Sequence, residues 1–200
     1  MFYSFIKQLK SVSWATFVFF LAAPALSQDS KTEAKPSMTL MEFTQPSDKT
    51  LWIAVNDGVM GGLSQGSAKI DSGVLHFSGT LSLENNGGFS SIRTSGSGFD
   101  LSTAKCMVLR IKGDGRTYQL RLSTNARFRD SRISYGAEFA TQADTWMDAR
   151  IDFSTLKPSY RGTKLDGPPL DLSKVEEIGL LIGDKRAGDF LLQVDWMKAE

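Results

Sequence analysis

The sequence predicts an all-β protein with a β-sandwich or jelly-roll fold, and three features of the chain support this. Glycine-containing turns recur at roughly ten-residue intervals from residue 38 onward. The segments between these turns are short and alternate between polar and apolar residues, as half-buried strands do. No segment carries a sustained apolar stripe of helical spacing, and residues 172–177 are expected to form one helical turn at most. Many short strands without helical connections are typical of sandwiches and jelly rolls.

The clearest alternation lies at residues 73–84. Leu75, Phe77, Leu81 and Leu83 fall on one side of an extended chain, and the polar residues between them fall on the other. We therefore expect a strand with one face in the core and one face in water.

Two neighbouring runs predict a β-hairpin. Residues 107–112 and 118–123 are separated by a turn that contains Gly-Asp-Gly, and Asp-Gly tolerates the positive φ angles of a tight hairpin turn. In the second run Leu120 and Leu122 are expected to point inward, together with Tyr118.

Other segments of the same character predict further strands at Ser90–Thr94 and at residues 135–140, 146–151, 178–182 and 190–196. The last two are joined by residues 183–188 (GDKRAG). Trp52, Trp146 and Trp196 begin or end predicted strands, so we expect them in the core, where most strand aromatics of a sandwich lie.

Composition and charge exclude several classes of function. Lys and Arg total 23 against 22 Asp and Glu, a balance that excludes a polybasic nucleic-acid binder. A single cysteine, Cys106, excludes an intramolecular disulfide, and a single histidine, His76, excludes a multi-histidine metal centre. His76 lies on the expected wet face of its strand with no catalytic motif around it. We therefore expect no enzymatic activity, no cofactor and no metal.

The N-terminus has the features of a secretory signal peptide. Lys7 and Lys10 precede an apolar run at residues 12–23, and small residues follow up to Ser27. A mitochondrial transit peptide is expected to be rich in arginine, whereas the first arginine of this chain is Arg93. An uncleaved anchor is the less favoured alternative, since the apolar run is shorter than the about 20 residues that span a bilayer. We therefore expect cleavage after Ser27 and a periplasmic or secreted protein.

This interpretation divides the chain into a signal peptide (1–27), a flexible linker (28–37) and one domain (38–200). The linker is polar and free of aromatic residues, as solvated segments are. After cleavage no membrane span is expected in the mature chain.

Two glycine-rich segments, residues 56–64 (NDGVMGGLS) and 85–88 (NNGG), invite a nucleotide-binding interpretation. A P-loop requires Gly-Lys-Ser/Thr, and a dinucleotide fold requires the glycines to open a helix after a strand. Neither feature is present. We expect loops whose glycines adopt positive φ and whose Asn and Asp side chains bind nearby backbone groups.

Several motifs in order along the chain resemble the complex I intermediate-associated protein 30 family, from about residue 41 to residue 199. After Trp52 they are VNDGVMGGLSQG (55–66), FSGTLSLENNGGFSSIRT (77–94), KGDGRTYQLRL (112–122), YRG (160–162), GLLIGDKRAGDF (179–190) and VDW (194–196).

The resemblance implies a galactose-binding-domain-like β-sandwich, related in architecture to carbohydrate-binding modules and without enzymatic activity. Mitochondrial members of that family assist assembly of NADH:ubiquinone oxidoreductase as chaperone-like factors. We therefore expect a non-catalytic, monomeric binding protein that assists assembly of a protein complex, with a membrane-complex subunit as its partner. The alternative is a carbohydrate-binding protein whose partner is a glycan.

Candidate binding residues lie on the polar side of the expected strands and in the loops. Arg121 is opposite in parity to Leu120 and Leu122, and Arg93 is opposite to Ile92, so both arginines are expected on a wet face. The full candidate set is Asn56, Asp57, Asn85, Asn86, Arg93, Arg121 and Tyr160. An alternative is that the two arginines are structural and hold the glycine loops by pairing with Asp57 or Glu84.

Overall fold

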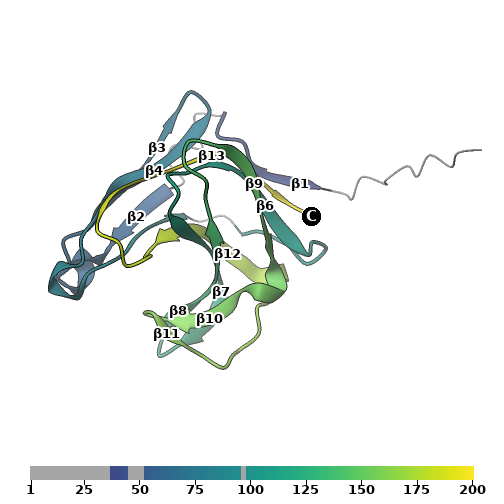
Figure 1. The fold of residues 1–200 in the computed structure, drawn as a ribbon. Coiled ribbons are helices and arrows are strands. Elements are labelled where there is room, and N and C mark those ends of the chain that lie inside the picture. The colour runs from purple at the N-terminus through teal and green to yellow at the C-terminus, as the bar shows by residue number, and fades with distance from the viewer. Residues whose placement is uncertain (1–36, 45–51, 96–97) are drawn as a thin grey trace, which may run out of the picture. The chain divides into compact units, whose positions relative to one another are not determined.

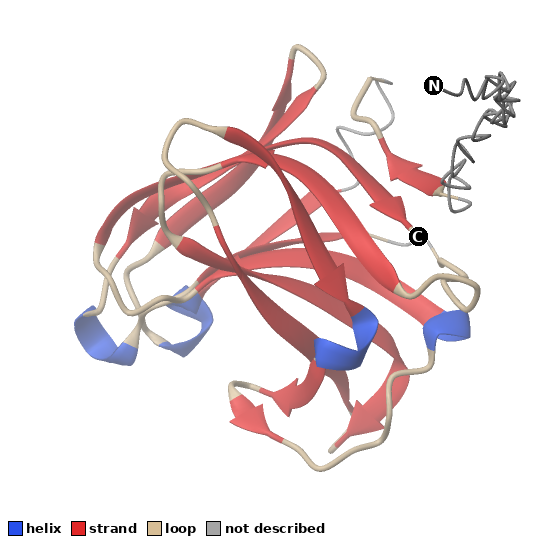
Figure 2. Ribbon diagram, turned by 45° about the vertical axis from the view of Figure 1, so that its right-hand side comes forward, coloured by secondary structure: helices blue, strands red, loops and turns tan. Residues whose placement is uncertain are grey.

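The structure, a computed structural model, describes residues 37–44, 52–95 and 98–200. The expected signal peptide and all but the last residue of the expected linker lie outside the described residues. Two antiparallel β-sheets pack face to face, and the helices between the strands are short 3-10 turns (Figures 1 and 2). The predicted all-β sandwich is therefore confirmed.

The first sheet has six strands, and their order across the sheet differs from their order in the sequence. The order is β3 (Gln65–Asp71), β4 (Val74–Leu81), β13 (Gly188–Ala199), β6 (Cys106–Lys112) and β9 (Trp146–Asp152), and β1 (Met38–Met41) also pairs with β13.

The second sheet has seven strands. The order is β11 (Thr163–Lys164), β10 (Lys157–Tyr160), β8 (Ser131–Ala140), β7 (Thr117–Phe128), β12 (Val175–Ile182), β5 (Ser90–Thr94) and β2 (Trp52–Asn56). The 3-10 turns are η2 (Asp57–Met60), η3 (Glu84–Asn86), η4 (Phe153–Thr155) and η5 (Leu172–Lys174). The turn η5 matches the single helical turn expected near residue 172.

The core lies between the sheets and is built from the inward-facing residues of alternating strands. On β4, Leu75 and Phe77 are fully buried, whereas Leu83 lies beyond the end of the strand and is 46% exposed. On β7, Leu120 is fully buried, as the alternation predicted. The ring of Tyr118 lies 6.3 Å from that of Phe77 in an edge-on contact that joins the two sheets. Such aromatic pairs add to the stabilisation from burial alone.

The predicted hairpin at residues 107–123 is wrong. Strand β6 pairs with β13 and β9 in the first sheet, whereas β7 pairs with β8 and β12 in the second. The intervening turn therefore crosses from one sheet to the other. The reason lies in Asp114, whose Oδ2 accepts hydrogen bonds from the hydroxyl of Tyr118 (3.0 Å) and from the backbone N–H of Leu191 on β13 (2.9 Å). This carboxylate ties both sheets together, which a two-residue hairpin turn does not require.

A second crossing, at residues 183–188, is fixed to the first by Arg116. This side chain is 5% exposed and binds Asp184 with two hydrogen bonds, Nε to Oδ2 at 3.0 Å and Nη2 to Oδ1 at 2.6 Å. It also donates to the carbonyl groups of Arg186, Gly188 and Asp189. The contact raises the pKa of Arg116 and lowers that of Asp184. The guanidinium thus satisfies the polar groups where the chain leaves β12 and enters β13.

Two tryptophans expected in the core lie on the outer face of the first sheet. Trp146 is 36% exposed, and Arg110 and Lys112 lie over its ring at 6.0 and 5.9 Å. Trp196 follows a register shift on β13 that places it opposite Arg110, and the ammonium of Lys198 lies 4.4 Å from its ring centre. A one-residue bulge changes which side chains face the core, so the alternation before residue 195 does not predict Trp196.

We expect Arg116→Ala to lower the free energy of unfolding by about 3–5 kcal/mol, because it leaves the buried carboxylate of Asp184 without its partner. The matched control is Arg110→Ala, whose ion pair with Asp148 is exposed (37% and 53%) and should cost less than about 1 kcal/mol. Urea denaturation of the three proteins measures the difference. Equal effects of the two substitutions would contradict the role given to Arg116.

Candidate functional site

Two cavities meet at Arg121 on the face of the second sheet that points away from the core. The larger, of about 660 Å³, lies among β7, β8, β9, η4, β10 and β11. The smaller, of about 460 Å³, lies among β7, β12 and the glycine-rich loops after β2 and before β5. Gln119, Arg121 and Gly162 line both cavities, and we call the combined hollow the Arg121 groove.

Arg121 lies in a row of residues that runs across the second sheet. Its backbone neighbours are Gly179 on β12 and Gly136 on β8, and Gly179 pairs in turn with Arg93 on β5. A Cβ atom at Gly136 would lie 3.7 Å from Cγ of Arg121, in ordinary contact. The two glycines therefore leave bare backbone on both sides of the arginine, which opens the floor of the groove.

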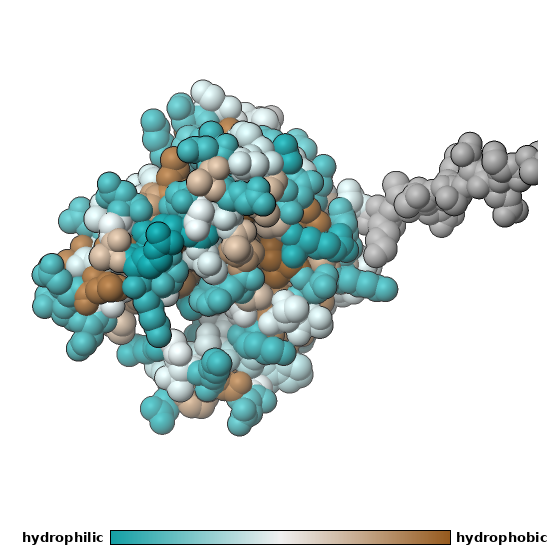
Figure 3. Space-filling model, viewed as in Figure 1, coloured by the Kyte–Doolittle hydropathy of each residue, from teal (hydrophilic) through white to brown (hydrophobic). Residues whose placement is uncertain are grey.

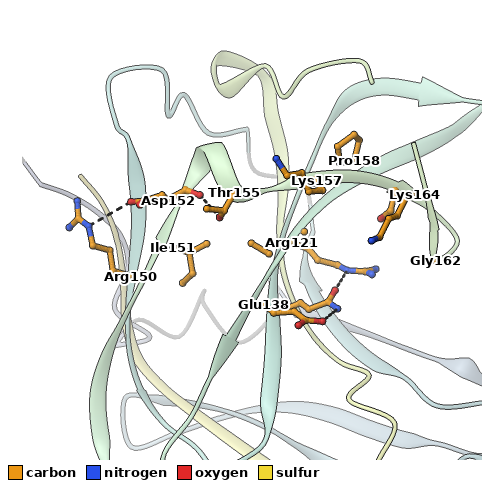
Figure 4. Close-up of a pocket in the computed structure, with 14 residues that line it drawn as sticks. Arg121, Glu138, Arg150, Ile151, Asp152, Thr155, Lys157, Pro158, Gly162 and Lys164 are labelled. Atoms are coloured by element: carbon orange, nitrogen blue, oxygen red, sulfur yellow. Dashed lines mark hydrogen bonds and ion pairs between the residues drawn. The ribbon is translucent and has the colours of Figure 1, made fainter. Parts of the chain in front are cut away.

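The guanidinium of Arg121 is half-buried and forms no ion pair within the described part of the chain. Its Nε donates to Oε1 of Gln119 (3.3 Å), and Nε2 of Gln119 donates to Oε1 of Glu138 (3.3 Å), as Figure 4 shows. Burial lowers the pKa of Arg121, yet an arginine in a protein keeps its charge. Its two terminal amino groups have no acceptor among the residues that the structure describes.

Other cations line the groove in excess over anions. Lys157, Lys164 and Arg161 have no ion pair among the described residues, and Arg161 lies 5.4 Å from the ring centre of Tyr160. Arg150 also lines the larger cavity, but Figure 4 shows it directed away, and it pairs with Glu200 at 2.6 Å. The potential of the groove is therefore positive.

The wall of the smaller cavity is held by one buried carboxylate. Asp57 is fully buried and accepts hydrogen bonds from the N–H and hydroxyl of Ser64 (2.9 and 2.6 Å) and from the N–H groups of Gly88 and Phe89 (2.6 and 3.3 Å). Burial raises the pKa of Asp57, but the hydrogen bonds from Ser64, Gly88 and Phe89 together outweigh it and hold the pKa below its usual value. This one side chain joins the two glycine-rich loops.

Two of the glycines in these loops are explained by this carboxylate. A Cβ atom at Gly62 would lie 2.4 Å from Cγ of Asp57, and one at Gly87 would lie 2.6 Å from its Oδ2. Positive φ, the reason expected from the sequence, applies instead to Gly61 (φ 90°) and Gly88 (φ 128°). Gly62 and Gly87 are therefore needed because the loops fold closely around Asp57.

The loop after β2 presents two apolar side chains at the rim of the groove. Val59 is 75% exposed and Met60 is 59% exposed, and both line the smaller cavity with Phe89 and Leu181. Figure 3 shows a small apolar patch at the left-hand end of the molecule, where the chain leaves β2, and further apolar surface near the centre of the view. An exposed apolar rim beside a polar groove is typical of an interaction surface.

The structure brings few of the sequence-predicted site residues into the groove. Arg121 lines both cavities. Arg93 lies on the same sheet face but pairs with Glu177 at 3.7 Å. Asn85 and Asn86 are exposed residues of η3 with positive φ, and they line neither cavity.

Two further candidates have structural contacts. Asn56 accepts from Gly66 N–H (3.1 Å) and Ser90 hydroxyl (2.7 Å), and it donates to the carbonyl of Gly66 (3.1 Å). The ring of Tyr160 packs edge-on against Phe128 at 5.3 Å. The alternative pairs the two arginines with Asp57 or Glu84. Among the described residues the partners of Asp57 are Ser64, Gly88 and Phe89, whereas Arg93 pairs with Glu177 and Arg121 donates to Gln119.

Sequence reasoning missed Lys157, Lys164, Arg161 and Glu138 as groove residues. The alternation of inward and outward residues along β7 did indicate Gln119, which lies on the same face of the strand as Arg121. The others depend on the pairing of β10 with β8 and β11, a long-range register that local alternation does not contain.

The described residues offer little for metal or redox chemistry. They contain no group of three or more His, Cys, Asp or Glu side chains that could hold a metal ion. His76 lies on β4 opposite Gln193, in the first sheet, and lines neither cavity. Within the described ranges no helix is long and apolar enough to cross a membrane.

The family model for complex I intermediate-associated protein 30 matches residues 41–194 of this chain. The chain belongs to this family. A mouse relative, "Complex I intermediate-associated protein 30, mitochondrial", is 28% identical over 178 residues, which cover 78% of this chain and 54% of the relative. The chain therefore spans about half the length of that protein.

Solved structures with the same fold include carbohydrate-binding modules. The family 11 module of the cellulase Lic26A-Cel5E of Clostridium thermocellum superposes with a TM-score of 0.64 at 18% identity and covers 83% of this chain and 95% of the module. The agarase AgWH50C superposes with a TM-score of 0.55 at 14% identity, over 82% of this chain and 24% of the agarase. At these identities the likeness shows the fold alone.

The comparison corrects the compartment expected from the N-terminus. The mouse relative is a mitochondrial protein, which points to a mitochondrial protein rather than to a periplasmic or secreted one. Residues 1–27 contain lysines and serines and no acidic residue, and these features are shared by mitochondrial transit peptides. The lack of arginine was therefore too weak a criterion.

We expect Asp57→Asn to destabilise the protein by about 3 kcal/mol, because an amide group would face the N–H donors that the carboxylate now accepts. Because the folded-state pKa of Asp57 is lowered, its stabilisation is present above the unfolded pKa of about 3.9 and is lost as the pH falls through the folded value. Denaturant unfolding between neutral and acidic pH measures both effects. Asp71→Asn, at an exposed site on β3, is the control and should change stability by less than about 0.5 kcal/mol.

Gly62→Ala should destabilise the protein by about 1–3 kcal/mol, because the added Cβ overlaps the carboxylate of Asp57. Gly58→Ala, in the same loop, is the matched control, since nothing lies within 4 Å of its Cβ position. Thermal unfolding compares the two. A smaller effect at Gly62 than at Gly58 would show that the loop does not depend on contact with Asp57.

Proposed function

We propose that this protein is a non-catalytic assembly factor that binds a protein subunit of NADH:ubiquinone oxidoreductase (complex I) while the complex is being built. The observation that carries the proposal is the family match over residues 41–194, which include the whole second sheet, most of the first sheet and every residue of the Arg121 groove. The name of the mouse relative associates that protein with intermediates of complex I.

The chemistry of the groove supports binding rather than catalysis. A general base or nucleophile must lie within hydrogen-bond reach of its proton and be oriented by a third group. The groove holds cations that have no ion pair among the described residues and two carboxylates, Glu138, which accepts from Gln119, and Asp152, which lies 3.8 Å from Arg150. These groups recognise a partner by charge and hydrogen bonding.

Carbohydrate binding is the second candidate, because a module solved with a β-1,3-1,4-linked tetrasaccharide has the same fold at a TM-score of 0.63 and 18% identity. Sugar rings pack on flat aromatic faces, and aromatic side chains with a polar end, Tyr and Trp, serve that purpose best. Neither residue type lines the Arg121 groove; Phe89 is the aromatic side chain there. The groove therefore favours a protein partner.

The tagged full-length protein, cross-linked in its native cells, should co-migrate with subassemblies of complex I on native gels, and mass spectrometry should identify the bound subunit. Loss of the protein should lower the amount of mature complex and raise that of its subassemblies. A glycan array with the same purified protein tests the second candidate. Glycan retention together with no enrichment of respiratory subunits would contradict the assembly function and favour carbohydrate binding.

A further inference from the structure

Arg121 is a partly buried arginine that has no ion pair among the described residues. On the second sheet and at its edge, Arg93, Arg116 and Arg132 each pair with a carboxylate. The Nε–H of Arg121 donates to the neutral side chain of Gln119. The two terminal amino groups of Arg121 have no acceptor among the described residues and can donate to a ligand. These two groups form a planar fork that matches the two oxygens of a carboxylate.

The groove leaves space for a ligand to reach this fork. Gly136 and Gly179 place bare backbone beside Arg121, and nothing lies within 4 Å of the Cβ position of Gly162. Figure 4 shows the guanidinium directed toward the turn that carries Gly162 and Lys164. A ligand can therefore approach the sheet backbone closely while its charged end meets the arginine.

The charges around the fork select an anion. Lys157, Lys164 and Arg161 have no ion pair within the described ranges. The acidic side chains that line the groove are Glu138, which accepts from Gln119, and Asp152, which lies 3.8 Å from Arg150. The excess of positive charge attracts an anionic group and repels a cationic one.

The apolar rim requires a second feature in the ligand. Val59 and Met60 are exposed at the same groove, and their loop is held in place by the hydrogen bonds of Asp57. A ligand that meets both the guanidinium and this rim carries an acidic group and an aliphatic group a short distance apart. A polypeptide segment that contains Glu or Asp beside Leu, Ile or Val has this chemistry, whereas an acidic sugar lacks the aliphatic part.

We propose that the Arg121 groove binds a segment of the partner protein in which a carboxylate side chain pairs with Arg121 and an adjacent aliphatic side chain packs on Val59 and Met60. The proposal rests on the proposed function in one respect, that the partner is a protein. It identifies the chemical class of the segment that the assembly factor recognises.

The test uses the full-length protein and three synthetic peptides, acetyl-SLEELS-amide, acetyl-SLQQLS-amide and acetyl-SGEEGS-amide. Calorimetry should show that the first binds and that acetyl-SLQQLS-amide binds at least about tenfold more weakly, since a charge-assisted contact is worth about 1.5–3 kcal/mol. Acetyl-SGEEGS-amide should also bind at least about tenfold more weakly, since it lacks the aliphatic side chains that pack on Val59 and Met60. Affinity for the first peptide should fall as the salt concentration rises. In ¹⁵N spectra the Nε–Hε signal of Arg121 should shift on titration.

Arg121→Gln should weaken binding of acetyl-SLEELS-amide at least about tenfold while the melting temperature stays within a few degrees. Arg110→Gln, on the outer face of the first sheet, is the matched control and should bind as the unchanged protein does. Met60→Ser should weaken the first peptide but not acetyl-SGEEGS-amide. Absence of binding at millimolar concentration, equal affinity for the Glu and Gln peptides, or tighter binding of oligogalacturonate or a neutral β-glucan tetrasaccharide would overturn the proposal.

The same variant separates this proposal from the proposed function. If Arg121→Gln co-migrates with complex I subassemblies as strongly as the unchanged protein, the assembly function stands and the groove is not the recognition site. If the unchanged protein binds acetyl-SLEELS-amide through Arg121 but enriches no respiratory subunit, the groove proposal stands and the assembly function fails.

Discussion

The arrangement of the candidate site depends on the buried carboxylate of Asp57. A charged group removed from water costs stability unless hydrogen bonds replace its hydration. Here the replacement comes from Ser64, Gly88 and Phe89, which belong to two loops far apart in the chain. Neither loop can move without leaving the charge unsatisfied. The apolar rim formed by Val59 and Met60 is therefore a fixed part of the groove. Asp57 itself is fully buried, so a ligand in the groove does not contact it.

Arg116 and Arg121 show that the pairing of a charge, rather than the type of residue, separates structure from function in this fold. Arg116 is buried, and it satisfies Asp184 and three carbonyl groups where the chain crosses between the sheets. Arg121 lies on β7, five residues after Arg116 in the chain. It is flanked by two glycines and has a neutral hydrogen-bond partner. Arg116 is paired within the protein, whereas Arg121 is the charge that we propose pairs with a ligand.

Much of the fold could be predicted from alternation, but the site depends on contacts that alternation does not report. The strand at Ser90–Thr94 and the inward side of β7 follow from local pattern, which sets a strand's two faces. The Gly-Asp-Gly turn was wrongly predicted to close a hairpin, because Asp114 accepts a hydrogen bond from Leu191 on the distant strand β13. Asp57 in an Asn-Asp-Gly sequence has the local signature of an ordinary turn, and nothing near it in the chain reveals that two loops will enclose it.

The fold shared with carbohydrate-binding modules leaves the occupant of the groove undecided, because one architecture supports many sites. The side chains that line the groove are the basis for the proposed protein partner. An assembly factor must bind its partner and later release it, and a deep apolar pocket would make release slow. A partly buried guanidinium with a small aliphatic rim gives electrostatic contacts that salt weakens, so that attraction between charges speeds association while dissociation stays fast. These contacts suit the role that we propose for the Arg121 groove, which is to bind a segment of the partner and later release it.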